Sequence, residues 1–191
     1  MISPLLANLY GIFLEKKLSI WLESEGKQAK GQAGFRRQHS TTDHLVTLSI
    51  IVEECHNDKS NLFCCFVDFR KAFDTVPRNN LWNRLEELNV PFELRATAIR
   101  LYTNVIAKLK SNKGWSKDIK CNIGVKQGCP LFSTLFGIYI DKLEGCLEEA
   151  GCADMILVGI VIILLLYADD IVLLARCPSN LDKQLRLLKD F

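Results

Sequence analysis

Short apolar runs mark the strands that this chain is expected to form. Residues 160–166 and 171–174 are apolar and rich in β-branched side chains, and they flank the tetrapeptide Tyr-Ala-Asp-Asp at 167–170. This pattern is typical of two buried strands joined by a tight turn. It predicts a hairpin with both aspartates at its bend. Residues 62–69 form another apolar, aromatic-rich run, which is predicted to be a strand that carries Asp68 near its end.

Apolar residues at helical spacing predict the helices around these strands. One helix is expected over residues 5–22, and a second runs from a cap at 41–43 through residues 45–55. No low-complexity linker or fixed repeat interrupts the chain, so it is interpreted as one mixed α/β unit. The remaining predictions are helices over 81–88, 92–105, 133–149 and 179–191, and a hairpin that turns at 112–114.

The adjacent carboxylates of Asp169 and Asp170 interrupt apolar sequence that extends from residue 155 to residue 174. An ionised carboxylate in apolar surroundings costs several kcal/mol unless it is paired or bound to a metal. The pattern therefore favours a cation site on the turn. If the strand at 62–69 lies beside the hairpin, Asp68 supplies a third carboxylate. Oxygen-only clusters suit Mg²⁺, with Mn²⁺ as an alternative ion.

Two other interpretations of this turn stay open at this point. An ordinary hairpin can carry an exposed Asp-Asp turn without any metal. A membrane span is disfavoured, because the uninterrupted apolar stretch at 155–167 is shorter than the roughly 18 to 20 residues that cross a bilayer. Extending the stretch would place both carboxylates in lipid, where acids are rare and costly. No membrane contact is therefore expected.

Composition and charge narrow the classes of protein to consider. The 191 residues, of which 49% are hydrophobic, suit one domain or a fragment of a larger one. A net charge of +2 is too small for a strongly basic nucleic-acid binder, so any such footprint has to be local. Lysines near Asp118 can bind phosphate or simply guard sheet edges. They are Lys108, Lys110, Lys113, Lys117, Lys120 and Lys126.

Cysteine usage and the start of the chain bear on the compartment. The eight cysteines show no paired spacing typical of a zinc site, and the three histidines show no ligand spacing with them. No charged segment followed by an apolar segment and a cleavage site opens the chain. Thiols in such a context are expected to stay reduced. The sequence thus predicts an intracellular protein of the cytoplasm, the nucleus or both.

Four segments in order carry a resemblance to a known family. They are residues 32–36 (Gln-Ala-Gly-Phe-Arg), 66–74 (Phe-Val-Asp-Phe-Arg-Lys-Ala-Phe-Asp), 124–131 (Gly-Val-Lys-Gln-Gly-Cys-Pro-Leu) and 167–170. Together they resemble the reverse transcriptase domain of non-LTR (LINE-type) retrotransposons, over nearly the whole chain. The resemblance implies an α+β fold. This fold is the palm of a right-hand polymerase, an antiparallel sheet with helices packed on one face, with partial fingers and the thumb missing.

The resemblance also implies a reaction and the residues that perform it. Enzymes of this family are RNA-directed DNA polymerases, which add dNTPs to the 3′-OH of a DNA primer on an RNA template by two-metal phosphoryl transfer. Asp68 and Asp169 are implied to be catalytic metal ligands, with Asp170 as the weaker third acid and the backbone carbonyl of Phe69 as a further candidate ligand. Two Mg²⁺ ions are the implied cofactors.

Substrate contacts are implied at four other residues. Phe73 corresponds to an aromatic ring that packs under the incoming sugar and excludes a 2′-OH, although it can also be a plain core aromatic. Gln127 and Gly128 correspond to a nucleotide-contact site, where glycine permits a close backbone approach and the amide can hydrogen-bond base or sugar. Arg36 corresponds to a fingers arginine that contacts phosphate, with a solvated loop arginine as the alternative.

The chain departs from the family pattern at Phe132-Ser133, where the family has Ser-Pro. This puts the start of the following helix and the placement of primer and template in doubt. Both ends are expected to be cut, with 1–61 as partial fingers and junction and 62–191 as a C-terminally truncated palm. Such a fragment is expected to be weakly active or inactive alone. The alternatives are a catalytically inactive, degenerate RNA-binding module and a different two-metal phosphotransferase or nuclease. The oligomeric state is not predicted.

Overall fold

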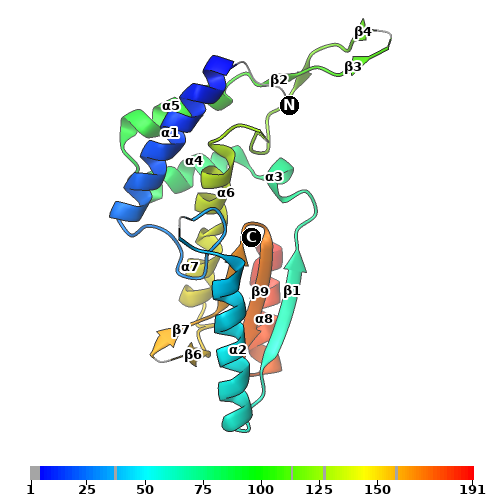
Figure 1. Ribbon diagram of the computed structural model, residues 1–191. Helices are drawn as coiled ribbons and strands as arrows, with labels where there is room; N and C mark the ends of the chain where they lie inside the picture. The colour runs from blue at the N-terminus through cyan, green and yellow to red at the C-terminus, as the bar shows by residue number, and fades with distance from the viewer. Residues whose placement is uncertain (1–4, 37, 113, 127, 158) are drawn as a thin grey trace. The chain divides into compact units, whose positions relative to one another are not determined.

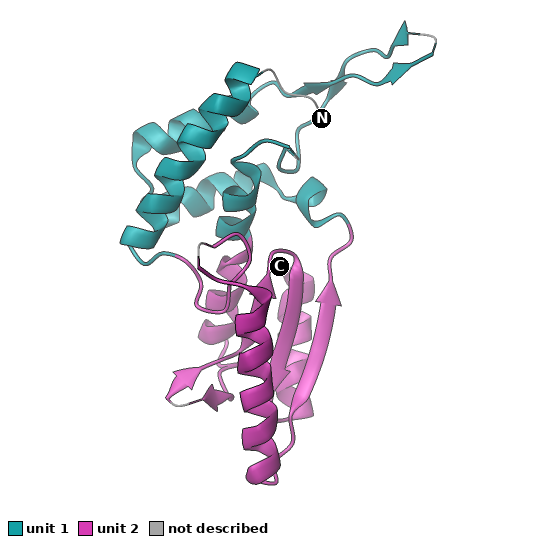
Figure 2. Ribbon diagram, viewed as in Figure 1, with its two compact units in different colours: residues 1–27, 71–139 teal, residues 28–70, 140–191 magenta. Residues whose placement is uncertain are grey.

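The chain folds as two compact units, each assembled from two separate stretches of sequence (Figure 2). Unit 1 comprises residues 1–27 and 71–139, and unit 2 comprises residues 28–70 and 140–191. The predicted division at residue 61 into fingers and palm is a family assignment and stays a prediction. The structure is a computed structural model, and it describes residues 5–36, 38–112, 114–126, 128–157 and 159–191.

Unit 2 is built on a three-stranded antiparallel sheet (Figure 1). Its strands lie in the order β1 (Phe63–Asp68), β9 (Asp170–Ala175) and β8 (Leu164–Tyr167). The other elements of the unit are the helices α2 (Thr41–Asn57), α7 (Lys142–Glu149) and α8 (Pro178–Asp190), and a small separate hairpin of β6 (Ile156–Leu157) and β7 (Ile160–Val161).

Both faces of this sheet are apolar. Leu164, Leu165 and Leu166 of β8 are all buried, although successive side chains of a strand point to opposite faces. Helix α2 covers one face, where Ile51 and Cys55 pack with Leu165, and α8 lies on the other side of the sheet (Figure 1). The predicted α+β class with an antiparallel sheet is confirmed, and the helical cover extends to both faces rather than one.

Unit 1 is mainly helical. Helix α1 (Leu5–Ser24) packs against α5 (Phe92–Tyr102), and α5 packs against α4 (Arg78–Glu87). A hairpin of β3 (Lys110–Ser111) and β4 (Gly114–Trp115) lies at the predicted turn at 112–114, whose last residue begins β4 and whose residue 113 lies outside the described residues. The other elements are α3 (Ala72–Thr75), α6 (Phe132–Ile140), whose last residue belongs to unit 2, and the strand pairs β2 (Ile106–Ala107) with β5 (Ile119–Lys120) and β3 (Lys110–Ser111) with β4 (Gly114–Trp115).

Two predicted elements are divided in the structure. The single helix predicted over 133–149 is the two helices α6 and α7, separated at Asp141, whose carboxylate accepts a hydrogen bond from the N–H of Ala29 (3.1 Å). The single strand predicted over 160–166 is β7 and β8, because β7 pairs with β6 while β8 pairs with β9. Within the described ranges, no helix combines the length and the apolar character needed to cross a bilayer.

Candidate functional site

Three carboxylates meet at one end of the three-stranded sheet. Asp68, the last residue of β1, lies directly opposite Asp170, the first residue of β9. Asp170 also pairs with Tyr167 of β8, so Ala168 and Asp169 form a two-residue turn. Opposite Cα atoms in an antiparallel pair are about 5 Å apart and successive Cα atoms about 3.8 Å, which places Asp68 within about 9 Å of Asp169. The sheet register brings the three predicted acids together, and their roles as ligands stay predictions.

The surroundings of these carboxylates are more polar than the sequence suggested. Asp68 and Asp170 are exposed, and Asp169 is half-buried. None of the three side-chain carboxylates makes a hydrogen bond or an ion pair within the described part of the chain. The expectation that their charge is held inside apolar structure is wrong. The apolar flanks are buried, but the turn end of the hairpin is accessible to water.

The donor set suits Mg²⁺, which binds one or two carboxylates and completes its shell with water and phosphate oxygens. Among the residues that the structure describes, the three acids have no competing partners, and their backbone positions are close. As the side chains are placed, however, no three His, Cys, Asp or Glu residues among those the structure describes are close enough together to hold a metal ion. The residues therefore fit a divalent ion in identity and backbone position, and binding requires the carboxylates to rotate toward one another.

The turn adopts a costly backbone conformation at Ala168, whose φ is +59°. A left-handed φ costs alanine about 1 kcal/mol, because its Cβ approaches the carbonyl oxygen too closely, and glycine is the usual residue at such a turn position. The N–H of Ala168 donates to Gln32 Oε1 (3.3 Å), and the N–H of Gly34 donates to the same oxygen (2.7 Å). A Cβ atom on Gly34 would lie 2.1 Å from Ala168 N, so only glycine fits there.

The segment that carries Gln32 runs beside β8. Gln32 forms an isolated parallel bridge with Leu166 of this strand. The N–H of Leu166 donates to Gly31 O (2.8 Å), and the N–H of Ala33 donates to Leu166 O (2.9 Å). His44 of α2 donates its Nε2–H to the same Leu166 carbonyl (2.8 Å). The segment is thus fixed to the strand that leads into the turn.

Two buried acids hold the other side of this segment. Asp141 accepts hydrogen bonds from the N–H of Ala29 (3.1 Å) and from Gln32 Nε2 (3.5 Å). Burial raises the pKa of the Asp141 carboxyl to about 6, against the opposing effect of these hydrogen bonds. Glu144 accepts from the N–H of Gly31 at 3.3 Å through both of its oxygens, and burial raises its pKa as well. The sequence analysis did not identify either acid, because no local motif marks them as inward-facing.

Comparison with known proteins identifies the family. The family described as reverse transcriptase (RNA-dependent DNA polymerase) matches residues 13–191. The chain belongs to the reverse transcriptase family.

Individual relatives of this chain are mobile-element proteins. Over 154 residues the chain is 28% identical to the Retrovirus-related Pol polyprotein from type-1 retrotransposable element R2 of Nasonia vitripennis, covering 81% of this chain and 15% of the relative. Over 150 residues it is 30% identical to the RNA-directed DNA polymerase from mobile element jockey of Drosophila funebris, covering 77% and 15%. The predicted relation to non-LTR retrotransposon polymerases is confirmed. The chain spans 15% of the length of each of these relatives.

Solved structures with a similar fold include telomerases. The chain matches telomerase from Candida albicans, solved in complex with a fragment of telomeric RNA, with a TM-score of 0.65 and 17% identity, over 94% of this chain and 31% of that one. It matches apo telomerase from Candida tropicalis with a TM-score of 0.59 and 13% identity, over 95% and 37%. At these identities the likeness shows the fold alone.

In unit 1 of the chain, Phe73 belongs to an aromatic cluster. Its half-buried ring lies with its centroid 5.4 Å from that of Phe132 and 4.6 Å from that of Phe136. Phe132 is the residue that departs from the family pattern, and α6 nevertheless begins at it. The edge-on contact with Phe73 gives the bulky ring a place to pack. Whether Phe73 also excludes a ribose 2′-OH stays a prediction.

The predicted nucleotide-contact loop is described in part. Gln127 lies outside the described residues, and Gly128 is exposed with a φ of +86°. Arg78, which the sequence analysis did not identify, is buried and holds the segment that precedes this loop. Its planar fork of donors suits several acceptors at once. The guanidinium donates to the carbonyl oxygens of Cys121 (2.6 Å), Gly124 (2.8 Å), Ile123 (3.1 Å) and Tyr102 (3.2 Å).

Arg36 and Phe69 lie in unit 2. Arg36 donates from Nη1 to the carbonyl oxygens of Ala29 (3.1 Å) and Gln32 (3.2 Å), so its half-buried guanidinium stabilises its own loop. Phe69 is half-buried and directly follows Asp68 at the end of β1. Contact of Arg36 with phosphate and of the Phe69 carbonyl with a metal both stay predictions.

Two of the six lysines that were predicted to bind phosphate contact other groups of the protein. Lys108 forms an ion pair with Asp118 (3.0 Å). Lys126 donates to the carbonyl oxygen of Leu101, and burial lowers its pKa. Phosphate binding by the rest stays a prediction. The exposed members are Lys110, Lys117 and Lys120, and Lys113 lies outside the described residues.

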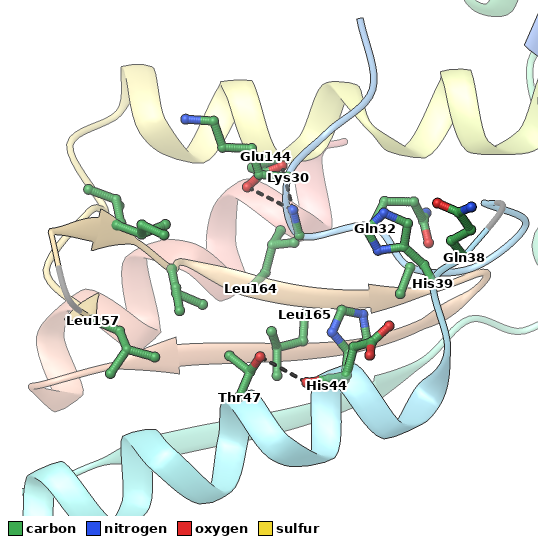
Figure 3. A pocket seen from close by; sticks show the side chains of 16 residues that line it. Lys30, Gln32, Gln38, His39, His44, Thr47, Glu144, Leu157, Leu164 and Leu165 are labelled. Atoms are coloured by element: carbon green, nitrogen blue, oxygen red, sulfur yellow. Dashed lines mark hydrogen bonds between the residues drawn. The ribbon is translucent and has the colours of Figure 1, made fainter. Parts of the chain in front are cut away.

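A cavity of about 540 Å³ lies in unit 2 beside the 31–34 segment (Figure 3). One part of its wall is apolar and includes Leu157 and Leu165, whereas His44 and Thr47 enter it from α2. Gln32 also lines it. The cavity thus adjoins the residues that hold the turn, and it includes none of the three acids.

Proposed function

We propose that this chain carries the catalytic centre of an RNA-directed DNA polymerase, which transfers a deoxynucleotide from a dNTP to the 3′-OH of a DNA primer on an RNA template. The observation that carries the proposal is the register of the sheet, in which Asp68 faces Asp170 beside the turn at Asp169. Membership in the reverse transcriptase family supports the reaction class.

The three acids would hold two Mg²⁺ ions, or Mn²⁺ in their place. Asp68 and Asp169 are the proposed main ligands, with Asp170 and the carbonyl of Phe69 as weaker ones. Such ions lower the pKa of the attacking hydroxyl and neutralise charge on the triphosphate. The protein contributes carboxylates that have no competing partner in the described ranges, at the end of a sheet whose apolar strands fix their backbone positions.

Other residues are proposed to contact the substrates. Phe73 packs under the sugar of the incoming nucleotide, and Gly128 allows the backbone to approach it, with Gln127 beside it. Arg36 and the exposed lysines bind phosphates of the nucleic acid. An intracellular location, in the cytoplasm, the nucleus or both, is supported by eight cysteines that are all free thiols.

Primer extension tests this proposal. Incorporation of dNTPs on an RNA template with Mg²⁺ is measured for this chain and for a version extended toward the length of its relatives. Asp169→Ala should lower incorporation at least about a hundredfold, since it removes several kcal/mol of metal-dependent stabilisation. Asp58→Ala, which removes an exposed acid at the end of α2, is the matched control. The mechanism is wrong if the extended version incorporates nothing or if Asp169→Ala leaves incorporation intact.

A second function is favoured by one observation, namely that the acids as placed do not form a closed metal-binding group within the described residues. According to this second proposal, the chain is a catalytically inactive module that binds RNA. RNA affinity that falls steeply with salt, without incorporation by either version, would identify such a module.

A further inference from the structure

Gln32 is a buried polar side chain that contacts the turn directly. Only 2% of its surface is exposed. Figure 3 shows it near the end of β8 that leads into the turn. Its Oε1 accepts hydrogen bonds from the N–H groups of Gly34 (2.7 Å) and Ala168 (3.3 Å). One amide oxygen therefore joins the 31–34 segment to the residue that immediately precedes Asp169.

The orientation of this amide is fixed from its other end. Because Oε1 faces two N–H donors, the NH₂ group of Gln32 has to face an acceptor. That acceptor is Oδ1 of Asp141 (3.5 Å), whose second oxygen accepts from the N–H of Ala29 (3.1 Å). An ionised carboxylate can only accept hydrogen bonds, so Asp141 excludes the flipped amide.

We propose that Gln32 is the positioning residue of the catalytic turn, that Asp141 fixes the orientation of its amide, and that the pair thereby determines where the Asp169 carboxylate lies. The proposal rests on the proposed function for its catalytic consequence. Its structural content, the placement of the turn, can be measured without turnover.

The physical reason is the strained backbone of Ala168. Without Oε1, two buried N–H groups lose their acceptor, and each costs about 1–3 kcal/mol if it stays unsatisfied. The turn then loses the hydrogen bond that holds Ala168 at its positive φ, and we expect it to relax toward a conformation that moves Asp169. Partners one layer behind metal ligands commonly contribute about 10- to 100-fold to metal affinity or activity.

The amide of Gln32 and the carboxylate of Asp141 can also be exchanged between the two positions. In Asp141→Asn, the carbonyl oxygen has to accept from the N–H of Ala29, so the new NH₂ faces the NH₂ of Gln32 and drives the amide to flip. In Gln32→Glu, two carboxylates face each other. The double variant Gln32→Glu/Asp141→Asn restores every donor and acceptor, because the glutamate accepts at both ends and the asparagine donates to it.

The experiment compares these variants with Gln32→Ala and with the matched control Gln184→Ala. Gln184 is a fully buried glutamine of α8 whose Nε2 donates to Leu174 O (2.9 Å), away from the turn. Three quantities are measured: amide hydrogen exchange at Ala168 and Gly34 by NMR, Mn²⁺ affinity by electron paramagnetic resonance, and the rate of primer extension.

Gln32→Ala, Gln32→Glu and Asp141→Asn should each speed exchange at Ala168 about five- to tenfold and weaken Mn²⁺ binding roughly 10- to 100-fold. The double variant should recover most of both losses. Gln184→Ala should lower stability without either local effect. The proposal is overturned if Gln32→Ala and Gln184→Ala change Mn²⁺ affinity alike, or if the double variant is no better than the single ones.

The outcomes separate this proposal from the proposed function. If the wild-type protein and its extended version incorporate no dNTP while the exchange and Mn²⁺ effects appear as expected, the positioning role stands and the polymerase assignment fails. If incorporation depends on Asp169 but Gln32→Ala leaves exchange, Mn²⁺ affinity and rate unchanged, the assignment stands and the positioning role fails. If Gln32→Ala does not fold, the comparison of Asp141→Asn with the double variant decides.

Discussion

The buried carboxyl of Asp141 should make this domain less stable as the pH rises. Burial is the main cause that raises its pKa from 3.8 to about 6, and the nearby charge of Glu144 adds to the rise. Hydrogen bonds from Ala29 and Gln32, together with the charge of Arg36, oppose it. Because the folded-state pKa exceeds the unfolded one, the folded protein binds this proton more tightly. The stability that the proton contributes is therefore lost as the pH rises from 3.8 to about 6.

The magnitude follows from the two pKa values. The interval from 3.8 to about 6 corresponds to about 3 kcal/mol, at about 1.36 kcal/mol for each pH unit. Asp141→Asn removes this titration. It also adds a cost that does not depend on pH, about 1–3 kcal/mol for its mismatched contact with Gln32. Relative to wild type, the variant should therefore gain about 3 kcal/mol between roughly pH 3.5 and pH 7.5, whatever the constant cost.

Urea unfolding followed by circular dichroism at both pH values gives this difference, and carbon-13 NMR of the Asp141 carboxyl gives its midpoint directly. The matched control is Asp58→Asn, which removes an exposed carboxylate at the end of α2. Its free-energy difference from wild type should be nearly the same at both pH values. Equal differences at both pH values for Asp141→Asn would refute the reasoning, since they would show that Asp141 is not a costly buried charge.

Two further predictions concern the turn and the proposed sugar contact. Gly34→Ala places a Cβ atom 2.1 Å from Ala168 N and should destabilise the fold by about 1–3 kcal/mol in urea unfolding. Gly145→Ala, with no neighbouring atom within 4 Å in α7, should instead stabilise it by up to about 1 kcal/mol, and equal effects of the two changes would contradict the close approach. Phe73→Val should raise incorporation of ribonucleotides relative to deoxynucleotides at least about tenfold, equivalent to about 1.4 kcal/mol. Unchanged selectivity in a primer-extension competition would leave Phe73 as a core aromatic only.

The sequence predicted those residues of the site whose positions follow from the local pattern of apolar and polar residues. A buried strand has to end near a polar residue to return to solvent, so the acids at Asp68 and Asp169 mark strand ends in the sequence itself. The sequence left open whether the strand at 62–69 lies beside the hairpin. In the structure β1 pairs with β9, with Asp68 opposite Asp170.

The elements that were predicted wrongly depend on contacts distant in sequence. Residues 133–149 have continuous helical spacing. The two helices are separated only at Asp141, whose carboxylate accepts a hydrogen bond from Ala29, 112 residues away. The apolar run at 160–166 gives no sign that its first residues pair with β6 rather than β9. Gln32 was visible in a motif, but its role needs Ala168, which is 136 residues away. The periodicity of apolar residues carries no information about contacts between residues so far apart in the sequence.

The acids at the turn and the buried Asp141 differ in how much their charge costs the fold. Asp68 and Asp170 are exposed, so their charges cost the fold little. The expensive charge is Asp141, which is 8% exposed and has no cation within an ion pair among the described residues. A neutral asparagine there would relieve that cost but would favour the flipped orientation of the Gln32 amide. The electrostatic cost thus falls on Asp141, which does not contact the turn itself but the Gln32 side chain that binds it. Because an ionised carboxylate can only accept hydrogen bonds, Asp141 determines how Gln32 holds the turn.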